Sequence, residues 1–194
     1  DAFVADAKVG ARYQFVLETP SGKLTRTDPY CRQLLTDGCH VIDPRAYAWK
    51  TPGFTRPSRA ASIVYELHLG SFAVEPGAAY GTFASAQKKL PDLAALGVNV
   101  VELMPVHQSG SDASRWGYNP QLFHTPKPSL GTPDELRAFV DEAHRLGMAV
   151  WLDLVVNHTD GSKAAPLYCF DGCSDTSAGT YFFPPGAYAT TPWG

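Results

Sequence analysis

The 194-residue sequence has no long apolar run, no basic cluster interleaved with aromatic residues, and only four cysteines. A membrane-spanning helix needs about 18 or more consecutive apolar residues, and no run approaches that length. Lysine and arginine together number 16 against 19 aspartates and glutamates, which gives a net charge of −3. These absences argue against a membrane and against a nucleic acid as partners.

The four cysteines are too few for a scaffold built from disulfides. Cys31 and Cys39, and likewise Cys169 and Cys173, lack the two-residue spacing common among zinc ligands, so a zinc site that includes His40 is disfavoured. Free thiols are the simplest expectation, and the CFDGC segment is also compatible with a small disulfide. We expect no metal and no cofactor.

The composition predicts a folded chain, since 44% of the residues are hydrophobic and only 18% are charged. The 17 glycines and 16 prolines indicate many ordered turns. The sequence begins at Asp1 without the charged and apolar regions of a leader, and it ends in TPWG, at Gly194, without a closing element. We therefore expect a fragment of a longer protein, with a cytoplasmic location.

Three regions differ in composition. Residues 1–50 contain short β-like runs, the clearest being ARYQFVLET (11–19) followed by the turn PSGK. Residues 51–61 are rich in loop-forming residues and form a linker. Residues 62–194 alternate strands with helices, which predicts the α/β class with a parallel sheet.

The alternation consists of strands at 62–72, 98–106 and 148–158, with helices at 83–96 and 132–147. We expect Pro91 to begin the second half of the first helix after a kink, and Gly97 to end that helix. Thr132 and Glu135 have the spacing of a capping box at the start of the second helix. Its apolar residues recur at intervals of three and four, which predicts one buried stripe.

The third strand carries the most information, because an aspartate interrupts its apolar residues. Alternation assigns one set of residues to an outward face covered by helices: Val150, Leu152, Leu154 and Val156. The opposite set faces inward: Trp151, Asp153, Val155 and Asn157. Burying a carboxylate costs several kcal/mol unless it is paired, so Asp153 is expected to have a cationic or hydrogen-bond-donating partner.

Several segments in this order resemble the α-amylase superfamily, glycoside hydrolase family 13. They are YELHLGSF (65–72), GVNVVELMPV (97–106), WGYNP (116–120), GTPDELRAFVDEAHRLG (131–147) and DLVVNH (153–158). VYELHLGSF and WGYNP are most similar to the group of branching enzymes, isoamylases and maltooligosyltrehalose trehalohydrolases. The resemblance implies the first three β/α units of a TIM (β/α)8 barrel. GARYQFVL and DPYCR are similar to the end of a family 48 carbohydrate-binding module, a small β-sandwich.

The family's nucleophile and acid/base carboxylates follow later strands of the barrel. The resemblance therefore places both carboxylates beyond Gly194 and assigns no catalytic residue to this sequence. Tyr118 matches a tyrosine that stacks on the sugar whose bond is cut, and His158 matches a histidine that hydrogen-bonds the same sugar. Asp153 matches an aspartate that positions an arginine beside the nucleophile.

Two further residues complete the expected substrate site. Trp116 belongs to the same motif as Tyr118 and is included with it. Asn157 matches a calcium ligand of some amylases, but hydrogen bonding at the strand end is the simpler role here.

Each of these residues also has a purely structural interpretation. The Tyr118 ring is compatible with loop packing, and His158 with a hydrogen bond inside a loop. Glu66 and His68 are expected to form a polar network in the barrel interior. The aromatic residues of the long segment after the third strand either form a platform for glucan or pack that segment.

The resemblance implies an enzyme that acts on α-glucan such as glycogen, starch or maltooligosaccharide, and a 1,4-α-glucan branching enzyme is the first expectation. Isoamylase-type debranching and trehalose-releasing hydrolysis are alternatives, the latter because TYFFPPGAYATTPWG (180–194) is similar to a trehalohydrolase pattern. An alternative from another functional class is that the chain is a non-catalytic glucan-binding fragment. A different α/β enzyme with similar strands would bind no glucan.

Overall fold

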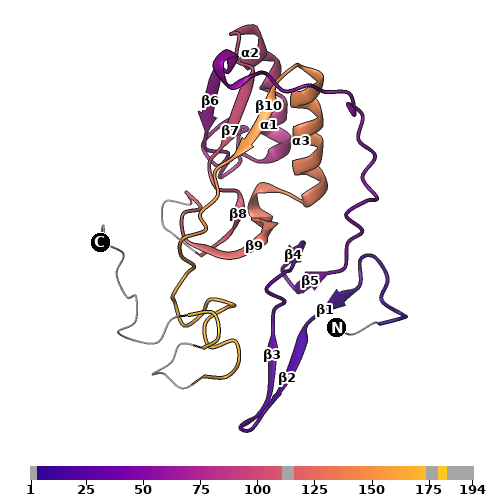
Figure 1. The fold of residues 1–194 in the computed structure, drawn as a ribbon, viewed down its shortest axis with the longest axis vertical. Coiled ribbons are helices and arrows are strands. Elements are labelled where there is room, and N and C mark those ends of the chain that lie inside the picture. The colour runs from indigo at the N-terminus through magenta and orange to yellow at the C-terminus, as the bar shows by residue number, and fades with distance from the viewer. Residues whose placement is uncertain (1–3, 111–115, 174–178, 183–194) are drawn as a thin grey trace.

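The computed structural model describes residues 4–110, 116–173 and 179–182. The trehalohydrolase-like residues from 183 onward, with the TPWG end and Gly194, lie outside these ranges, so the expectation that the catalytic carboxylates follow Gly194 stays a prediction. The N-terminal strands form small antiparallel sheets (Figure 1). One sheet has the order β1 (Arg12–Tyr13), β5 (Gly38–His40) and β4 (Leu34–Leu35), and the other is a hairpin of β2 (Phe15–Thr19) and β3 (Gly22–Arg26). The hairpin confirms the strand and turn predicted around residues 11–23.

The second half of the chain forms a three-stranded parallel sheet, as its alternating pattern predicts. Its order is β10 (Ala149–Leu152), β7 (Val100–Leu103) and β6 (Val64–Leu67). Helices α1 (Phe83–Gln87), α2 (Leu90–Ala95) and α3 (Pro133–Arg145) connect the strands and lie against the sheet (Figure 1). The parallel pairings and the helical crossovers are those of β/α units.

Local signals place the helix ends where the sequence predicts them. The Thr132 side chain accepts a hydrogen bond from the Glu135 backbone, and the Glu135 carboxylate accepts one from the Thr132 N–H, so the capping box is formed. Pro91 stands in the first turn of α2, so the predicted kink separates α1 from α2. Gly97 and Gly147 follow the helix ends with positive φ angles of 86° and 79°.

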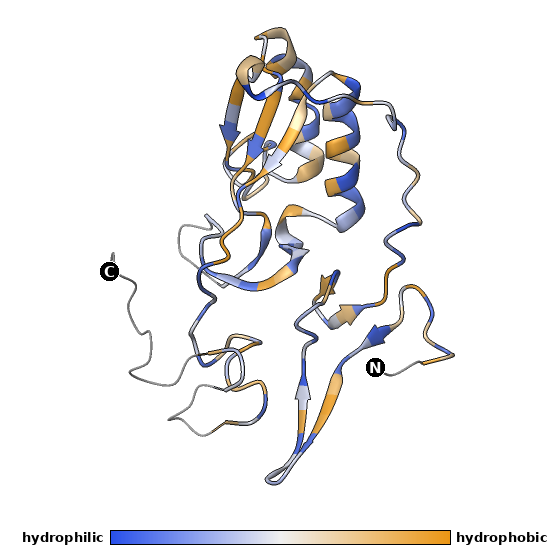
Figure 2. Cartoon of the chain, viewed as in Figure 1, coloured by the Kyte–Doolittle hydropathy of each residue, from blue (hydrophilic) through white to orange (hydrophobic). Residues whose placement is uncertain are grey.

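The main core lies between the sheet and the helices. Figure 2 shows apolar residues on the strands, and the fully buried side chains include Val101 and Leu103 of β7, Phe83 of α1 and Phe139 of α3. The inner stripe of α3 therefore packs as its periodicity predicts. None of the helices in the described part of the chain has the length and apolar character needed to cross a bilayer.

The outward face predicted for the third strand is only partly covered. Val150 packs against the core, whereas Leu152, Leu154 and Val156 are 44%, 60% and 78% exposed. The strand ends at Leu152, and no described segment covers the side chains beyond it. The prediction of a helix-covered face is therefore wrong for these three residues. Alternation along a strand assigns side chains to a face, but it does not show whether another element packs on that face.

A second antiparallel pair, β8 (His107–Ser109) and β9 (Pro120–Pro126), follows β7, and short 3₁₀ turns occupy Arg59–Ala61 and Pro128–Leu130. Leu122 of β9 is fully buried against Cys31 and Cys39 of the N-terminal region. The N-terminal strands and the β8–β9 pair thus share a small apolar cluster. The division into a β-sandwich at 1–50, a linker at 51–61 and a barrel part at 62–194 stays a prediction.

All four cysteines are in disulfides, so the expectation of free thiols is wrong. Cys31 pairs with Cys39, with the two Cα atoms 5.8 Å apart, and Cys169 pairs with Cys173 at 4.9 Å. The second bridge is the small disulfide that the CFDGC segment allows. The first was missed because the fold of the β4–β5 strands, which brings its cysteines together, is a tertiary feature.

The segment after β5 docks on α3 through one buried carboxylate, that of Asp141. Its oxygens accept hydrogen bonds from the backbone N–H groups of Lys50 (2.8 Å) and Thr51 (3.0 Å), the Thr51 hydroxyl and the Tyr47 hydroxyl (3.3 Å). Burial raises the pKa of the Asp141 carboxyl, but these hydrogen bonds outweigh burial and hold the pKa below its usual value. The predicted linker is thereby attached to α3 at this point.

Replacing Asp141 with alanine is expected to destabilise the fold by about 2–4 kcal/mol, because the N–H groups of Lys50 and Thr51 lose a charged acceptor. The native contribution of Asp141 should be complete at neutral pH and decline as the pH falls through its lowered native pKa. Urea unfolding at pH 7 measures the first effect, and a series from about pH 5 down to about pH 2 follows the second. Asp134→Asn, an exposed position on the same helix that forms a surface ion pair with Arg137, serves as the control and should change stability by no more than about 1 kcal/mol.

Candidate functional site

The candidate site lies past the carboxyl ends of the parallel strands. Asp153 directly follows β10, and its N–H still donates to the Leu103 carbonyl oxygen at 2.9 Å, which extends the strand ladder by one residue. The Tyr118 hydroxyl donates to Asp153 Oδ2 at 2.7 Å. The expected donor partner of Asp153 is therefore Tyr118, which is 35 residues earlier in the chain.

His158 holds the backbone of the same tyrosine. Its Nε2 hydrogen-bonds the Tyr118 carbonyl oxygen at 2.8 Å, so this nitrogen is the donor and carries a proton. The next two residues continue the attachment, since the Thr159 hydroxyl and the Asp160 N–H each donate to the Pro120 carbonyl at 2.7 Å. The structure thus joins Tyr118, Asp153 and His158 in one group.

Trp116 lies beside the end of the first parallel strand. Its ring is 43% exposed and stands 4.6 Å from the His68 ring at an interplanar angle of 31°. His68 Nδ1 is 3.0 Å from the Ser71 hydroxyl oxygen. No described contact joins the Trp116 ring to Tyr118. WGYNP therefore supplies two exposed rings, of which one lies beside His68 and the other is bonded to Asp153.

Asn157 is exposed, and the described contacts do not join it to Tyr118, Asp153 or His158. Within the described ranges, no group of three or more His, Cys, Asp and Glu side chains is placed to hold a metal ion. The assignment of Asn157 as a site residue stays a prediction.

Carboxylates dominate the electrostatics around Tyr118. The hydrogen bond to Asp153 is the largest influence on the hydroxyl and, with burial and the charges of Asp153, Glu66 and Glu102, raises the pKa of Tyr118 to about 12. Glu66 and Glu102 are register partners on β6 and β7, so they share one face of the sheet. The face of the sheet that carries Glu66 and Glu102 therefore has a negative charge, which favours neutral or cationic hydrogen-bond donors, and a polar network of Glu66 with His68 stays a prediction.

Replacing Asp153 with alanine should bring the Tyr118 pKa down toward the ordinary value of about 10. The raised pKa also means that this tyrosine contributes stability below pH 10, and that this contribution is lost as the pH rises toward 12. NMR of ¹³Cζ-labelled tyrosine, with Tyr118→Phe to assign the signal, follows the titration. An unchanged Tyr118 titration in Asp153→Ala would disprove the hydrogen bond as its main cause.

Two supporting residues of this group escaped sequence reasoning. His107 is 5% exposed; burial lowers its pKa, and the neighbouring backbone of Gly117 acts in the opposite direction. Gly117 has φ of +88°, and a Cβ placed there would overlap Pro105. The glycine of WGYNP is the one sequence signal that marks a special backbone conformation at this position.

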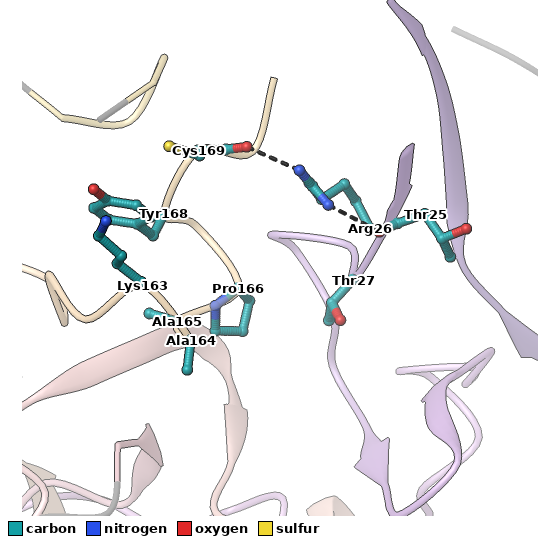
Figure 3. A pocket seen from close by; sticks show the side chains of 9 residues that line it. All are labelled: Thr25, Arg26, Thr27, Lys163, Ala164, Ala165, Pro166, Tyr168 and Cys169. Carbon is teal, nitrogen blue, oxygen red and sulfur yellow. Dashed lines mark hydrogen bonds between the residues drawn. The ribbon is translucent and has the colours of Figure 1, made fainter. Parts of the chain in front are cut away.

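A separate hollow of about 420 Å³ lies between β3 and the segment 163–169 (Figure 3). Arg26 crosses toward that segment and donates from Nη2 to the Cys169 carbonyl (3.0 Å) and from Nε to the Phe170 carbonyl (2.8 Å). None of Tyr118, Asp153 and His158 lines the hollow, and Arg26 there holds the segment to the hairpin.

The aromatic residues in the described part of this late segment contact each other. Tyr168 meets Phe182 at 5.8 Å between ring centroids, and Phe170 meets Tyr181 at 5.4 Å. Of the two interpretations that the sequence leaves open, these contacts favour packing of the segment over a glucan platform.

Parallel strands that alternate with helices, with aromatic and polar side chains collected past their carboxyl ends, are the β/α units from which TIM-barrel enzymes are built. The model of the alpha amylase catalytic domain matches residues 66–183. The chain belongs to the α-amylase family, glycoside hydrolase family 13, as its motifs predict.

Three known proteins illustrate the similarity. A malto-oligosyltrehalose trehalohydrolase of Deinococcus radiodurans is 40% identical over 84% of this chain and 27% of its own length. A 1,4-alpha-glucan branching enzyme of Burkholderia thailandensis is 35% identical over 89% of this chain and 22% of its own. A solved structure described as an alpha amylase from Salmonella typhimurium has a TM-score of 0.70 at 40% identity, and covers 81% of this chain and 26% of that chain. The chain thus spans about a quarter of the length of the relatives that it matches.

Proposed function

We propose that this chain is the first part of an α-glucan-active enzyme whose Tyr118, Asp153 and His158 hold the sugar at the point of cleavage. The observation that carries the proposal is the hydrogen-bonded group itself, which joins residues from two distant motifs past the carboxyl ends of the strands. Catalytic residues of TIM-barrel enzymes come from this end of the barrel.

The exposed Tyr118 ring suits the apolar face of a sugar, because an aromatic ring offers a large flat surface at little entropic cost. Since His158 Nε2 is occupied by the Tyr118 carbonyl, Nδ1 is the His158 atom left for a sugar hydroxyl. Asp153 keeps Oδ1 for the arginine that the family places beside the nucleophile. Trp116 supplies a second exposed ring beside His68, and Asn157 is kept as an exposed residue of the proposed site.

The bond-breaking carboxylates lie beyond Gly194 in the proposal. A retaining glycosidase needs its two working carboxyl groups about 5–5.5 Å apart, one as nucleophile and the other as acid/base. Glu66 and Glu102 form a register pair on the sheet, and the family resemblance assigns neither of them to bond breaking. We assign them an electrostatic role around Tyr118.

Two reactions are candidates for the whole protein. Hydrolytic release of trehalose from malto-oligosyltrehalose is placed first, supported by 40% identity to the Deinococcus radiodurans trehalohydrolase. The branching reaction predicted from the sequence is second, supported by 35–37% identity to several branching enzymes. The cytoplasmic location and the family 48 module at residues 1–50 remain part of the proposal.

The test begins with the native polypeptide, whose mass and peptides from strands 62–72 and 148–158 show whether these residues belong to a longer chain. That protein is then given malto-oligosyltrehalose and, separately, amylose. Free trehalose supports the hydrolase, and new α-1,6 linkages without a matching rise in reducing ends support branching. A native product of 21.0 kDa that binds glucan without cleaving it would overturn both and favour the non-catalytic module.

A further inference from the structure

Asp160 is a buried carboxylate that the proposed function leaves without a task. It is 5% exposed and lies in the segment after β10, two residues beyond His158. Its Oδ2 accepts a hydrogen bond from Gln121 Nε2 at 2.7 Å, and its Oδ1 accepts one from the Ser162 N–H at 2.9 Å. Burial raises the pKa of the Asp160 carboxyl, but the hydrogen bonds outweigh burial and hold the pKa below its usual value. Asp160 is therefore a charged group at neutral pH.

The carboxylate joins the segment after β10 to the β8–β9 pair through one glutamine side chain. Gln121 belongs to β9, and its Oε1 accepts a hydrogen bond from Gln108 Nε2 of β8 at 3.2 Å. The two contacts fix the orientation of the Gln121 amide, since the reversed amide would turn its oxygen toward the Asp160 carboxylate. Asp160 thus has a specific donor at a specific position, which surface packing alone would not supply.

A glycine leaves the space that this carboxylate occupies. The N–H of Gly110 donates to the Asn119 carbonyl oxygen at 3.0 Å, which places the end of β8 directly beside the WGYNP motif. A Cβ at Gly110 would lie 2.5 Å from Asp160 Oδ2 and 3.3 Å from the amide nitrogens of Asn119 and Gln121. The carboxylate therefore fits closely between the β8–β9 pair and the motif that carries the Tyr118 ring.

Asp160 stands at the end of a row of contacts that hold Tyr118. The Tyr118 carbonyl accepts from His158 Nε2 at 2.8 Å, and the Pro120 carbonyl accepts from the Asp160 N–H at 2.7 Å. The Tyr118 hydroxyl meets Asp153 Oδ2 at 2.7 Å. Because Asp153, His158 and Asp160 belong to one stretch of chain, that stretch holds Tyr118 by both its backbone and its hydroxyl. Where this stretch sits depends on what holds its far end.

We propose that Asp160 is a positioning residue whose buried carboxylate fixes the Tyr118 loop against the segment after β10, so that the Tyr118 ring is ordered on Asp153 before sugar binds. The carboxylate is turned toward Gln121 and Ser162, so it acts through Tyr118 and not on the sugar. The effect on turnover rests on the proposed function, whereas the effect on Tyr118 does not. A ring displaced by about 1 Å is enough to lower turnover by up to about 100-fold.

Asp160→Ala in the whole native polypeptide tests the proposal. We expect the Tyr118 pKa to fall from about 12 toward the ordinary value of about 10, because the hydroxyl loses its fixed position beside Asp153. We expect kcat/KM on the cleaved glucan to fall by about 10- to 100-fold. Asp141→Ala is the matched control, because Asp141 is a carboxylate of equal burial, 4% exposed, that accepts several hydrogen bonds but holds the linker. In folded protein it should leave both measurements unchanged.

A second variant keeps the carboxylate and moves it. Gly110→Ala places a methyl group against Asp160 Oδ2, so we expect the same fall in the Tyr118 pKa and a loss in kcat/KM of about 10-fold. Gly53→Ala is its control, since a Cβ there meets no atom within 4 Å. This pair decides the matter if Asp160→Ala does not fold.

The Tyr118 titration separates positioning from general support of the fold. An unchanged titration in Asp160→Ala and Gly110→Ala would overturn the proposal, and so would equal shifts in Asp160→Ala and Asp141→Ala. A shifted titration with unchanged kcat/KM would overturn the role in turnover. If the parent cleaves no glucan, the proposed function fails, while the titration still judges whether Asp160 positions Tyr118.

Discussion

Tyr118→Ala is expected to lower kcat/KM on α-glucan by about 100-fold in the whole protein, with a change in unfolding free energy of no more than about 1 kcal/mol. The ring is 41% exposed, so little core packing is lost with it. The loss falls on sugar binding because the variant removes both the flat surface and the hydroxyl that holds Asp153. Initial rates and urea unfolding, measured on the same preparation, separate the two quantities.

Two further variants distinguish the parts of this effect. Tyr118→Phe keeps the ring and loses only the hydrogen bond to Asp153, so we expect a smaller fall of about 10-fold. Tyr181→Ala removes a ring of similar exposure, 43%, outside the site and should leave kcat/KM unchanged. Unchanged turnover in Tyr118→Ala would remove this residue from the sugar site.

Gly117→Ala should be as damaging as the loss of Tyr118 itself and should also destabilise the fold by about 2–4 kcal/mol. The added methyl group meets two obstacles. A non-glycine residue at φ of +88° is strained, and its Cβ would lie 2.9 Å from Pro105 Cβ and overlap the Pro105 carbonyl oxygen. Because Gly117 precedes Tyr118, the displaced backbone also moves the ring.

Gly97→Ala is the matched control for the backbone strain. Gly97 has φ of +86°, yet a Cβ there would have no atom within 4 Å. We expect about 1 kcal/mol of destabilisation from strain alone, without loss of turnover. Equal effects on stability and turnover at Gly97 and Gly117 would show that the contact with Pro105 plays no part in holding Tyr118.

Sequence reasoning recovers the local elements because their causes are local. The capping box of Thr132 and Glu135, the kink at Pro91 and the glycine at the end of α2 each depend on residues within a few positions of each other. The periodicity of α3 likewise predicts its buried side, since a helix repeats every 3.6 residues. Asp153 is half-buried and follows β10, where a buried position within the strand was predicted, yet the cost of withdrawing a carboxylate from water correctly predicts its need for a donor.

The sequence alone therefore determined the order of the parallel strands and their helices, the family and the candidate site residues, but it missed the β8–β9 pair. The tertiary structure alone decided which of them meet: Tyr118 with Asp153 across 35 residues, and the Lys50–Thr51 backbone with Asp141. It also decided the pairing of Cys31 with Cys39 and the exposure of Leu154 and Val156. The physical reason is that periodicity and capping act between near neighbours along the chain, whereas burial, hydrogen-bond partners and pKa depend on segments that only the folded chain brings together.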